Sequence, residues 1–230
     1  MIVTDTVIAI DGSGAVGKTT IGRLLARRLG FLFIDTGVMY RALTWVAIER
    51  GLDVSDEESL VSLARGLRID IVRAPGAGDE NPERVLADGR DVSDEIKRPE
   101  VDRKVSIVSR HRGVREAMVA QQRVLVTDAG VVMVGRDIGT VVLPDATLKI
   151  YLTASLDERA RRRYLELREL GTSVVQTSIL SDLMRRDKID SERKESPLRP
   201  APDSRSIDTT HLTPEEVVNR ILELWGTAGG

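Results

Sequence analysis

The segment Gly12–Thr19 constrains the fold of this chain more than any other, because it fits the pattern G-x-x-x-x-G-K-[ST]. It follows Val7–Ile10, a short β-branched apolar run that is typical of a buried parallel strand. Apolar residues at helical spacing come next and end at Gly30, a frequent helix stop. In this context, backbone N–H groups can converge on phosphate oxygens at a helix N-terminus. The sequence therefore predicts a phosphate-binding P-loop within an α/β fold.

Each anchoring residue of the P-loop has an expected role. Lys18 is placed to reach the β and γ phosphates of a nucleotide, and Thr19 to ligate Mg²⁺. The residues expected to bind the nucleotide along the loop are Gly12, Ser13, Gly14, Ala15, Val16, Gly17, Lys18, Thr19 and Thr20. The alternative, a glycine-rich turn without a ligand, is much rarer for a complete pattern with these flanks.

The rest of the chain continues the alternation of strands and helices. Phe31–Ile34 completes a βαβ unit, and further strands are expected at 131–134, 148–152 and 207–208. Helices are expected at 37–51, 55–67, 101–109, 114–123, 156–170 and 179–187 and after Thr213, with Ser55–Glu58 and Thr213–Glu216 as N-terminal caps. Between 68 and 98, the sequence predicts a small antiparallel β insertion. Apolar residues there alternate with charged ones, 74–78 reads as a loop, and Asp88–Gly89 as a hairpin turn.

Composition narrows the classes of function. The length of 230 residues suggests one large domain, or one domain with an insertion. The formal net charge of −2 argues against a general electrostatic grip on nucleic acid, and 3% aromatic residues leave few stacking platforms. The absence of cysteine excludes disulfides, thiolate nucleophiles and iron–sulfur clusters. Without a signal-peptide pattern or an apolar run of membrane-spanning length, we expect a cytoplasmic protein with no membrane partner.

A P-loop alone does not distinguish a GTPase, an ATPase motor and a small-molecule kinase. No N-K-x-D segment is present, so the guanine-reading element of GTPase switches is missing. Arginines recur instead, and each offers a planar fork of donors to a second phosphorylated ligand. Histidines 111 and 211 lie outside every motif, so neither is a candidate general base. A phosphate acceptor needs little help from such a base, because its second pKa of about 6 leaves the phosphate largely dianionic at neutral pH.

Three further segments join the P-loop in one order and spacing: Asp35–Arg41, Gly135–Thr140 and Arg186–Arg193. Together they resemble the bacterial-type cytidylate kinase family, over about residues 7–224. The resemblance implies a P-loop NTPase-type parallel sheet flanked by helices, with a helical lid. It implies a single P-loop kinase domain over 1–230, an NMP-binding region at about 37–125 that includes the insertion at 68–98, and the lid at about 156–195.

The same resemblance implies a (d)CMP kinase of pyrimidine nucleotide metabolism, a mainly monomeric cytoplasmic enzyme that transfers phosphate from ATP to CMP and dCMP with Mg²⁺. The implied catalytic residues are Lys18, Arg136 and Arg193. Arg159, Arg162 and Arg163 share one face of the helix that begins near Leu156, and this face is expected to close over ATP, with Arg159 and Arg163 as ATP-binding residues. The implied CMP-binding residues are Arg41, Arg136 and Arg193 for the phosphate, Ser106, Arg115 and Asp137 for cytosine, Thr36 for the pocket wall, and Arg186 and Asp190 for the sugar.

Several alternatives stay open at this point. A kinase for UMP or AMP would use the same P-loop and arginines, and a nucleotide-dependent binding module would bind ATP without a soluble acceptor. Asp137 either accepts from the cytosine amino group or only orients an arginine. Asp11 either holds magnesium-bound water or only ends the strand. The family commonly has proline at position 13 and often glycine at position 15, so Ser13 and Ala15 are departures that concern loop stiffness and donor affinity more than activity.

Overall fold

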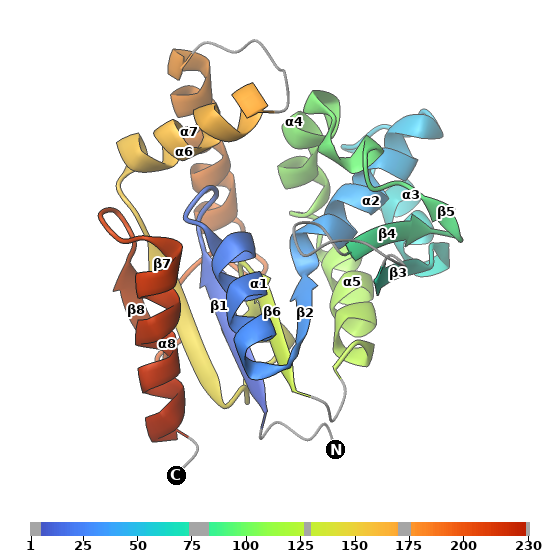
Figure 1. The fold of residues 1–230 in the computed structure, drawn as a ribbon. Coiled ribbons are helices and arrows are strands. Elements are labelled where there is room, and N and C mark those ends of the chain that lie inside the picture. Colours follow the sequence, from blue (N-terminus) through green and yellow to red (C-terminus); the bar gives the residue numbers. More distant parts are fainter. Residues whose placement is uncertain (1–5, 74–82, 127–129, 170–175, 229–230) are drawn as a thin grey trace. The chain divides into compact units, whose positions relative to one another are not determined.

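A computed structural model describes residues 6–73, 83–126, 130–169 and 176–228. The chain forms two compact units, drawn in Figure 1: one combines Met1–Ile34 with Leu125–Gly230, and the other is Asp35–Val124. Each unit is built around its own sheet. The expected loop at 74–78 lies outside the described residues. Within the described ranges, no helix is both long and apolar enough to cross a membrane.

The first unit contains a five-stranded parallel sheet with the strand order β2-β6-β1-β7-β8. The strands are β1 (Val7–Gly12), β2 (Leu32–Asp35), β6 (Val131–Gly135), β7 (Leu148–Thr153) and β8 (Arg205–Asp208). β1 is the central strand, and all six of its residues are buried. β1, β6 and β7 are buried along most of their length and have nearly continuous apolar runs, which is why they could be predicted to within two residues. The edge strands β2 and β8 contain exposed residues, so this reason does not apply to them.

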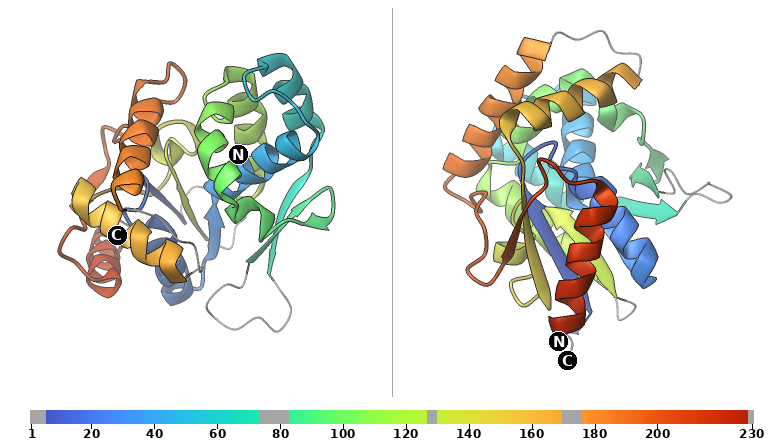
Figure 2. Two further views of the ribbon diagram at one scale, coloured as in Figure 1. Left: turned by 90° about the horizontal axis from the view of Figure 1, so that it is seen from above. Right: turned by 60° about the vertical axis from the view of Figure 1, so that its left-hand side comes forward.

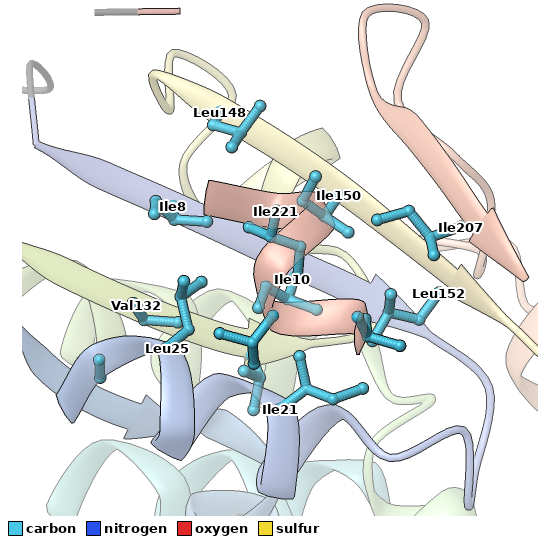
Figure 3. Packing of buried hydrophobic residues seen from close by; sticks show 14 of the residues in the cluster. Ile8, Ile10, Ile21, Leu25, Val132, Leu148, Ile150, Leu152, Ile207 and Ile221 are labelled. Atoms are coloured by element: carbon cyan, nitrogen blue, oxygen red, sulfur yellow. The ribbon is translucent and has the colours of Figure 1, made fainter. Parts of the chain in front are cut away.

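The helices of this unit are α1 (Lys18–Leu29), η2 (Ile138–Val142), α6 (Leu156–Glu169), α7 (Gln176–Glu192) and α8 (Pro214–Ala228). In Figure 3, Ile21 and Leu25 of α1 and Ile221 of α8 meet Ile8 and Ile10 of β1, forming the hydrophobic core. In Figures 1 and 2, α6 and α7 lie at the end of the sheet where β1 leads into the P-loop. Burial of this core supplies the main stabilisation that holds the P-loop in place.

α7 differs from the expected helix at 179–187, because it continues to Glu192. The segment 188–192 has no apolar periodicity, but it also has no glycine or proline, so nothing in the chain stops the helix there. η2 was not expected at all, because its five residues directly follow a strand and are too few to show helical periodicity.

The second unit combines helices with a small antiparallel sheet of order β3-β4-β5. Its elements are α2 (Thr36–Glu49), α3 (Glu57–Gly66), β3 (Ile69–Arg73), β4 (Glu83–Ala87), β5 (Arg90–Asp91), η1 (Glu95–Lys97), α4 (Pro99–Val108) and α5 (Arg112–Val124). Asp88 and Gly89 turn the β4–β5 hairpin with φ angles of +50° and +82°, as the Asp-Gly signal predicts. The antiparallel insertion is thus confirmed.

The N-terminal caps of two helices show how local chemistry defines helix starts. For α3, the expected Ser55 cap is wrong: Asp56 is the cap, and its carboxylate accepts from the backbone N–H groups of Glu58 and Ser59. The carboxylate of Asp56 can accept both bonds, so it takes the role one residue later. For α8, Thr213 and Glu216 form the expected reciprocal cap, with distances of 2.8 Å and 3.3 Å.

Candidate active site

The P-loop joins the end of β1 to the start of α1, as its sequence context predicts. Gly12 and Gly17 have φ angles of +153° and +93°, and a side chain at Gly12 would overlap the carbonyl oxygen of Leu152. Ala15 also has a positive φ, +60°, which a non-glycine residue adopts at some cost. Glycine would adopt this φ without that cost, which is the physical reason for glycine to be common at this position in the family that the sequence resembles.

Several cationic side chains contact the carbonyl oxygens of the P-loop. Lys18 Nζ donates to the oxygens of Gly12 at 2.7 Å and Ser13 at 2.6 Å. Arg136 Nη1 donates to the oxygen of Gly12 at 2.6 Å, and Arg159 Nη1 to that of Gly14 at 3.3 Å. Two of the three expected catalytic residues, Lys18 and Arg136, therefore meet at one peptide group.

Arg136 also connects the Gly135–Thr140 motif to the Arg186–Arg193 motif. Its Nε donates to Asp190 Oδ2 at 2.8 Å, and the Asp190 side chain is only 5% exposed. Arg193 Nη1 lies 4.0 Å from Asp190 Oδ1, and its Nε donates to the oxygen of Ser196 at 2.6 Å. Arg186 lies one helical turn before Asp190 on α7. A buried carboxylate thus holds two of the expected phosphate-binding arginines together.

Asp11 fixes the backbone that follows Arg136 and Asp137. Its two carboxylate oxygens accept from the N–H groups of Ile138 at 2.7 Å and Gly139 at 2.8 Å. Burial raises the pKa of Asp11 to about 6, although the two backbone N–H groups oppose that shift. Neither expectation for Asp11 included this contact with the turn after β6. Nothing local in the sequence indicates this partner, which is 127 residues away.

The arginines of α6 have distinct partners. Arg159 pairs with Asp187 at 2.6 Å, and Arg163 pairs with Glu166 at 2.8 Å. Arg162, which shares the expected helix face but is not among the expected ATP-binding residues, donates to the oxygen of Val16 in the P-loop at 3.3 Å. Arg161 is 58% exposed and pairs with Glu158. Helical spacing placed all these arginines on α6, but only the packing of α6 decides which of them contacts the P-loop.

Asp137, directly after Arg136, belongs to the first unit, and the remaining expected CMP-binding residues belong to the second. Arg41 of α2 donates to the oxygen of Ile96 at 3.1 Å and forms an ion pair with Asp102. Arg115 of α5 lies over the ring of Tyr40, 5.3 Å from its centroid, and donates to the oxygen of Ser109 at 3.0 Å. The residues of this set that are at least nine-tenths buried are Thr36, Ser106 and Arg115. Burial of a polar group is costly unless the group is hydrogen-bonded, and for Arg115 the oxygen of Ser109 is such a partner.

Comparison with known proteins places the chain in a family. A family model described as cytidylate kinase matches residues 8–227. The chain belongs to the cytidylate kinase family. Curated cytidylate kinases from Bacillus velezensis and Geobacillus kaustophilus are 47% and 49% identical to it, covering 94% of this chain and 95% of each relative. The cytidylate kinase of Caldanaerobacter subterraneus is 49% identical and covers 94% of this chain and 92% of its own length.

Among solved structures, an uncharacterised protein from Eubacterium ventriosum has a TM-score of 0.52 at 13% sequence identity. The match covers 97% of this chain and 99% of that protein. At this identity, the likeness concerns the fold alone. The family membership rests on the family model and the curated cytidylate kinases.

Proposed function

We propose that this member of the cytidylate kinase family transfers the γ-phosphoryl group of ATP to CMP, and to dCMP, forming ADP and CDP or dCDP. The observation that carries the proposal is the position of Arg136. Its guanidinium joins the P-loop oxygen of Gly12 to the buried Asp190. It therefore brings two family motifs against the nucleotide-binding loop. We further propose a monomer that acts in the cytoplasm on these small nucleotides.

The chemistry requires alignment and charge neutralisation rather than a general base. An oxygen of the CMP phosphate attacks the γ-phosphorus of ATP, the bond to the β–γ bridging oxygen breaks, and ADP leaves. Because the acceptor is already largely dianionic at neutral pH, no side chain has to remove a proton. Lys18, Arg136 and Arg193 supply positive charge to the phosphates, and the N-terminus of α1 adds backbone donors.

Mg²⁺ fits the residues at the start of α1. Thr19 lies in the first turn of the helix and is exposed, so its hydroxyl oxygen can act as a ligand. Among the described residues, no group of three His, Asp or Glu side chains could hold a metal ion. Kinases bind Mg²⁺ through few protein ligands together with phosphates and water, so a single hydroxyl ligand from Thr19 suits this mode of binding. Bound there, Mg²⁺ would neutralise charge on the β and γ phosphates of ATP.

For the acceptor, we propose that Asp137 accepts from the amino group of cytosine while Ser106 and Arg115 donate to its ring. Asp137 is only 3% exposed. Uracil would place a carbonyl oxygen opposite this carboxylate and leave a buried acceptor unpaired, which is strongly disfavoured. Thr36 and Arg41 would line the CMP pocket and bind its phosphate, Arg186 and Asp190 the sugar, and Arg159 and Arg163 the ATP phosphates.

A panel of acceptors tests the proposal. The purified protein is incubated with Mg-ATP and, separately, with CMP, dCMP, UMP, AMP and GMP, and the diphosphate products are identified together with ADP. We expect rapid formation of CDP and dCDP, with UMP slower by at least about 100-fold, because a site that hydrogen-bonds a substrate group rejects an analogue without it. A Lys18→Met variant prepared in parallel controls for a contaminating kinase.

Two results would contradict the proposal in different ways. Fast turnover of AMP or UMP with CMP inert would retain a nucleoside monophosphate kinase but replace its acceptor. Binding of ATP without any diphosphate product would favour a nucleotide-binding module instead.

A further inference from the structure

Three segments of the first unit meet at one carbonyl group of the P-loop, that of Val16. Arg162 Nη1, from α6, lies 3.3 Å from this oxygen, and Thr209 Oγ1, from the loop after β8, lies 3.2 Å from it. Thr209 is 1% exposed, and its backbone N–H donates to the oxygen of Thr153 in β7 at 2.8 Å. The Thr209 hydroxyl also lies 3.1 Å from the backbone oxygen of Thr153, so its single proton is shared between two acceptors. The oxygen of Val16 is therefore contacted by two side chains far away in the sequence, which are themselves hydrogen-bonded to each other.

The guanidinium of Arg162 is itself held in one orientation. Its Nε donates to Glu158 Oε1 at 2.8 Å, its Nη1 to Thr209 Oγ1 at 3.0 Å, and its Nη2 to the backbone oxygen of Thr209 at 2.5 Å. Hydrogen bonds from Arg161 and Arg162 lower the pKa of Glu158 to about 2, so Glu158 stays ionised at neutral pH. A planar guanidinium with these bonds loses little further freedom when it binds Val16.

The orientation of the Val16 carbonyl group determines where the next N–H group points. A trans peptide is planar, with its C=O and N–H directed to opposite sides. Because the oxygen of Val16 faces Arg162 and Thr209, the N–H of Gly17 faces away from them. Gly17 has a φ of +93° and precedes α1, which no side chain caps within the described residues. Glycine is conformationally permissive, so contacts from outside the loop are needed to fix this peptide.

We propose that Arg162 and Thr209 are positioning residues for ATP binding. They hold the Val16–Gly17 peptide so that the N–H of Gly17 faces the nucleotide phosphates. The inference rests on the proposed binding of ATP by the P-loop. It adds a role to Arg162 and to the loop after β8, which act through the Val16 carbonyl group. Preorganised donors avoid the cost of reorienting the backbone when the phosphates arrive.

Two variants of Thr209 separate positioning from packing. Thr209→Val keeps the shape of the side chain but removes the hydroxyl, whereas Thr209→Ser keeps the hydroxyl and removes a buried methyl group. We expect Thr209→Val to weaken the binding of a non-hydrolysable ATP analogue about five-fold, and Thr209→Ser to change it by less than about twofold. The binding constants are measured by calorimetry. A role in packing alone predicts the opposite order.

Arg162 and Arg161 form a matched pair, because both pair with Glu158 and only Arg162 also reaches Val16. We expect Arg162→Gln to raise the KM for ATP about ten-fold and to leave the KM for CMP unchanged at saturating ATP. Arg161→Gln should leave both within about twofold of the unmodified protein. The split between the two substrates is the readout that a merely structural role would not produce.

Clear outcomes would overturn the proposal. One is an unchanged affinity for the ATP analogue in both Thr209→Val and Arg162→Gln. Another is a parallel loss of ATP and CMP affinity, which would indicate a general structural role. If Thr209→Val does not fold, the pair Arg162→Gln and Arg161→Gln decides alone. Absence of CDP formation by the unmodified protein would refute the proposed function, while the comparison of ATP-analogue affinities would still test the positioning role.

Discussion

At the scale of single residues, Asp11 shows how one buried carboxylate links two motifs. It lies at the end of β1, directly before the P-loop, and binds the N–H groups that follow Arg136 and Asp137. Burial disfavours its charged form, and the negative charge of Asp137 adds to that effect. The residue that orders this turn therefore does so at a cost in electrostatic free energy.

That cost predicts an unusual dependence of stability on pH. The native pKa of Asp11, about 6, is higher than the 3.8 of the free side chain, so the native state binds its proton more tightly than the unfolded state. The resulting contribution to the unfolding free energy is present near pH 4 and is lost as the pH rises through 6. We expect the difference in unfolding free energy between the unmodified protein and Asp11→Asn to fall by roughly 2 kcal/mol from pH 4 to pH 7.

Urea unfolding of both proteins at several pH values measures this difference. Asp53→Asn is the control: Asp53 is fully exposed, and its bonds to Ser55 lower its pKa. The contribution of Asp53 to the unfolding free energy is present above pH 4 and is lost only in stronger acid. The difference in unfolding free energy between the unmodified protein and Asp53→Asn should therefore stay nearly constant from pH 4 to pH 7. If the difference in unfolding free energy for Asp11→Asn were also independent of pH, the charged form of Asp11 would not be disfavoured by burial.

At the scale of elements, helix starts are defined by short polar segments and not by the core. Asp56 caps α3, and Thr213 with Glu216 caps α8. α8 packs on the central sheet through Val217, Val218 and Ile221, all fully buried or nearly so. The cap therefore fixes where α8 begins, and the apolar face fixes how it packs.

Removal of the α8 cap should destabilise the protein by a small, definite amount. We expect Thr213→Ala to lower the unfolding free energy by about 1 kcal/mol, because the first turn of α8 loses an acceptor for its N–H groups. Thr213→Ser, which keeps the hydroxyl, should cost only a few tenths of a kcal/mol. Chemical unfolding and hydrogen exchange in the first turn of α8 give the measurement; equal stabilities for the two variants would contradict the capping role.

At the scale of the whole molecule, ligand binding should appear as stabilisation. The residues proposed for ATP lie in the first unit. A ligand at 100 times its dissociation constant stabilises the native state by about 2.7 kcal/mol. For a chain of this size, we expect a rise in Tm of about 5–10 °C with ATP or with CMP.

Asp137→Asn uses this stabilisation to test base recognition. We expect the variant to keep the rise in Tm with ATP, to lose much of the rise with CMP, and to reduce the preference for CMP over UMP, because the asparagine amide can donate to the uracil carbonyl. If Asp137 only orients Arg136, the stabilisation by CMP and that by UMP should fall in parallel. The preference for CMP over UMP should then stay unchanged. Arg161→Gln, on the exposed face of α6, is the control that should retain both responses.

Much of the fold could be predicted from local patterns. The strands expected at 131–134 and 148–152 match β6 and β7 within one residue, since strands buried on both faces are continuous apolar runs. The hairpin at Asp88–Gly89 and the P-loop depend on turn chemistry that is read over a few residues. The Ser55 cap was wrong by one residue because Ser55 and Asp56 are both good caps and the pattern does not rank them.

The sequence by itself determined the periodicities, the turns and the motif residues that identify the family, because each depends on neighbours within about one helical turn or one strand. Only the tertiary structure decided which distant groups meet: Asp11 with Ile138, Arg136 with Asp190, and Arg162 with Val16. Those contacts depend on the order β2-β6-β1-β7-β8 and on how α6 packs beside the P-loop. Helical spacing places Arg159, Arg162 and Arg163 on one face equally well, so packing alone selects the residues that hold the loop.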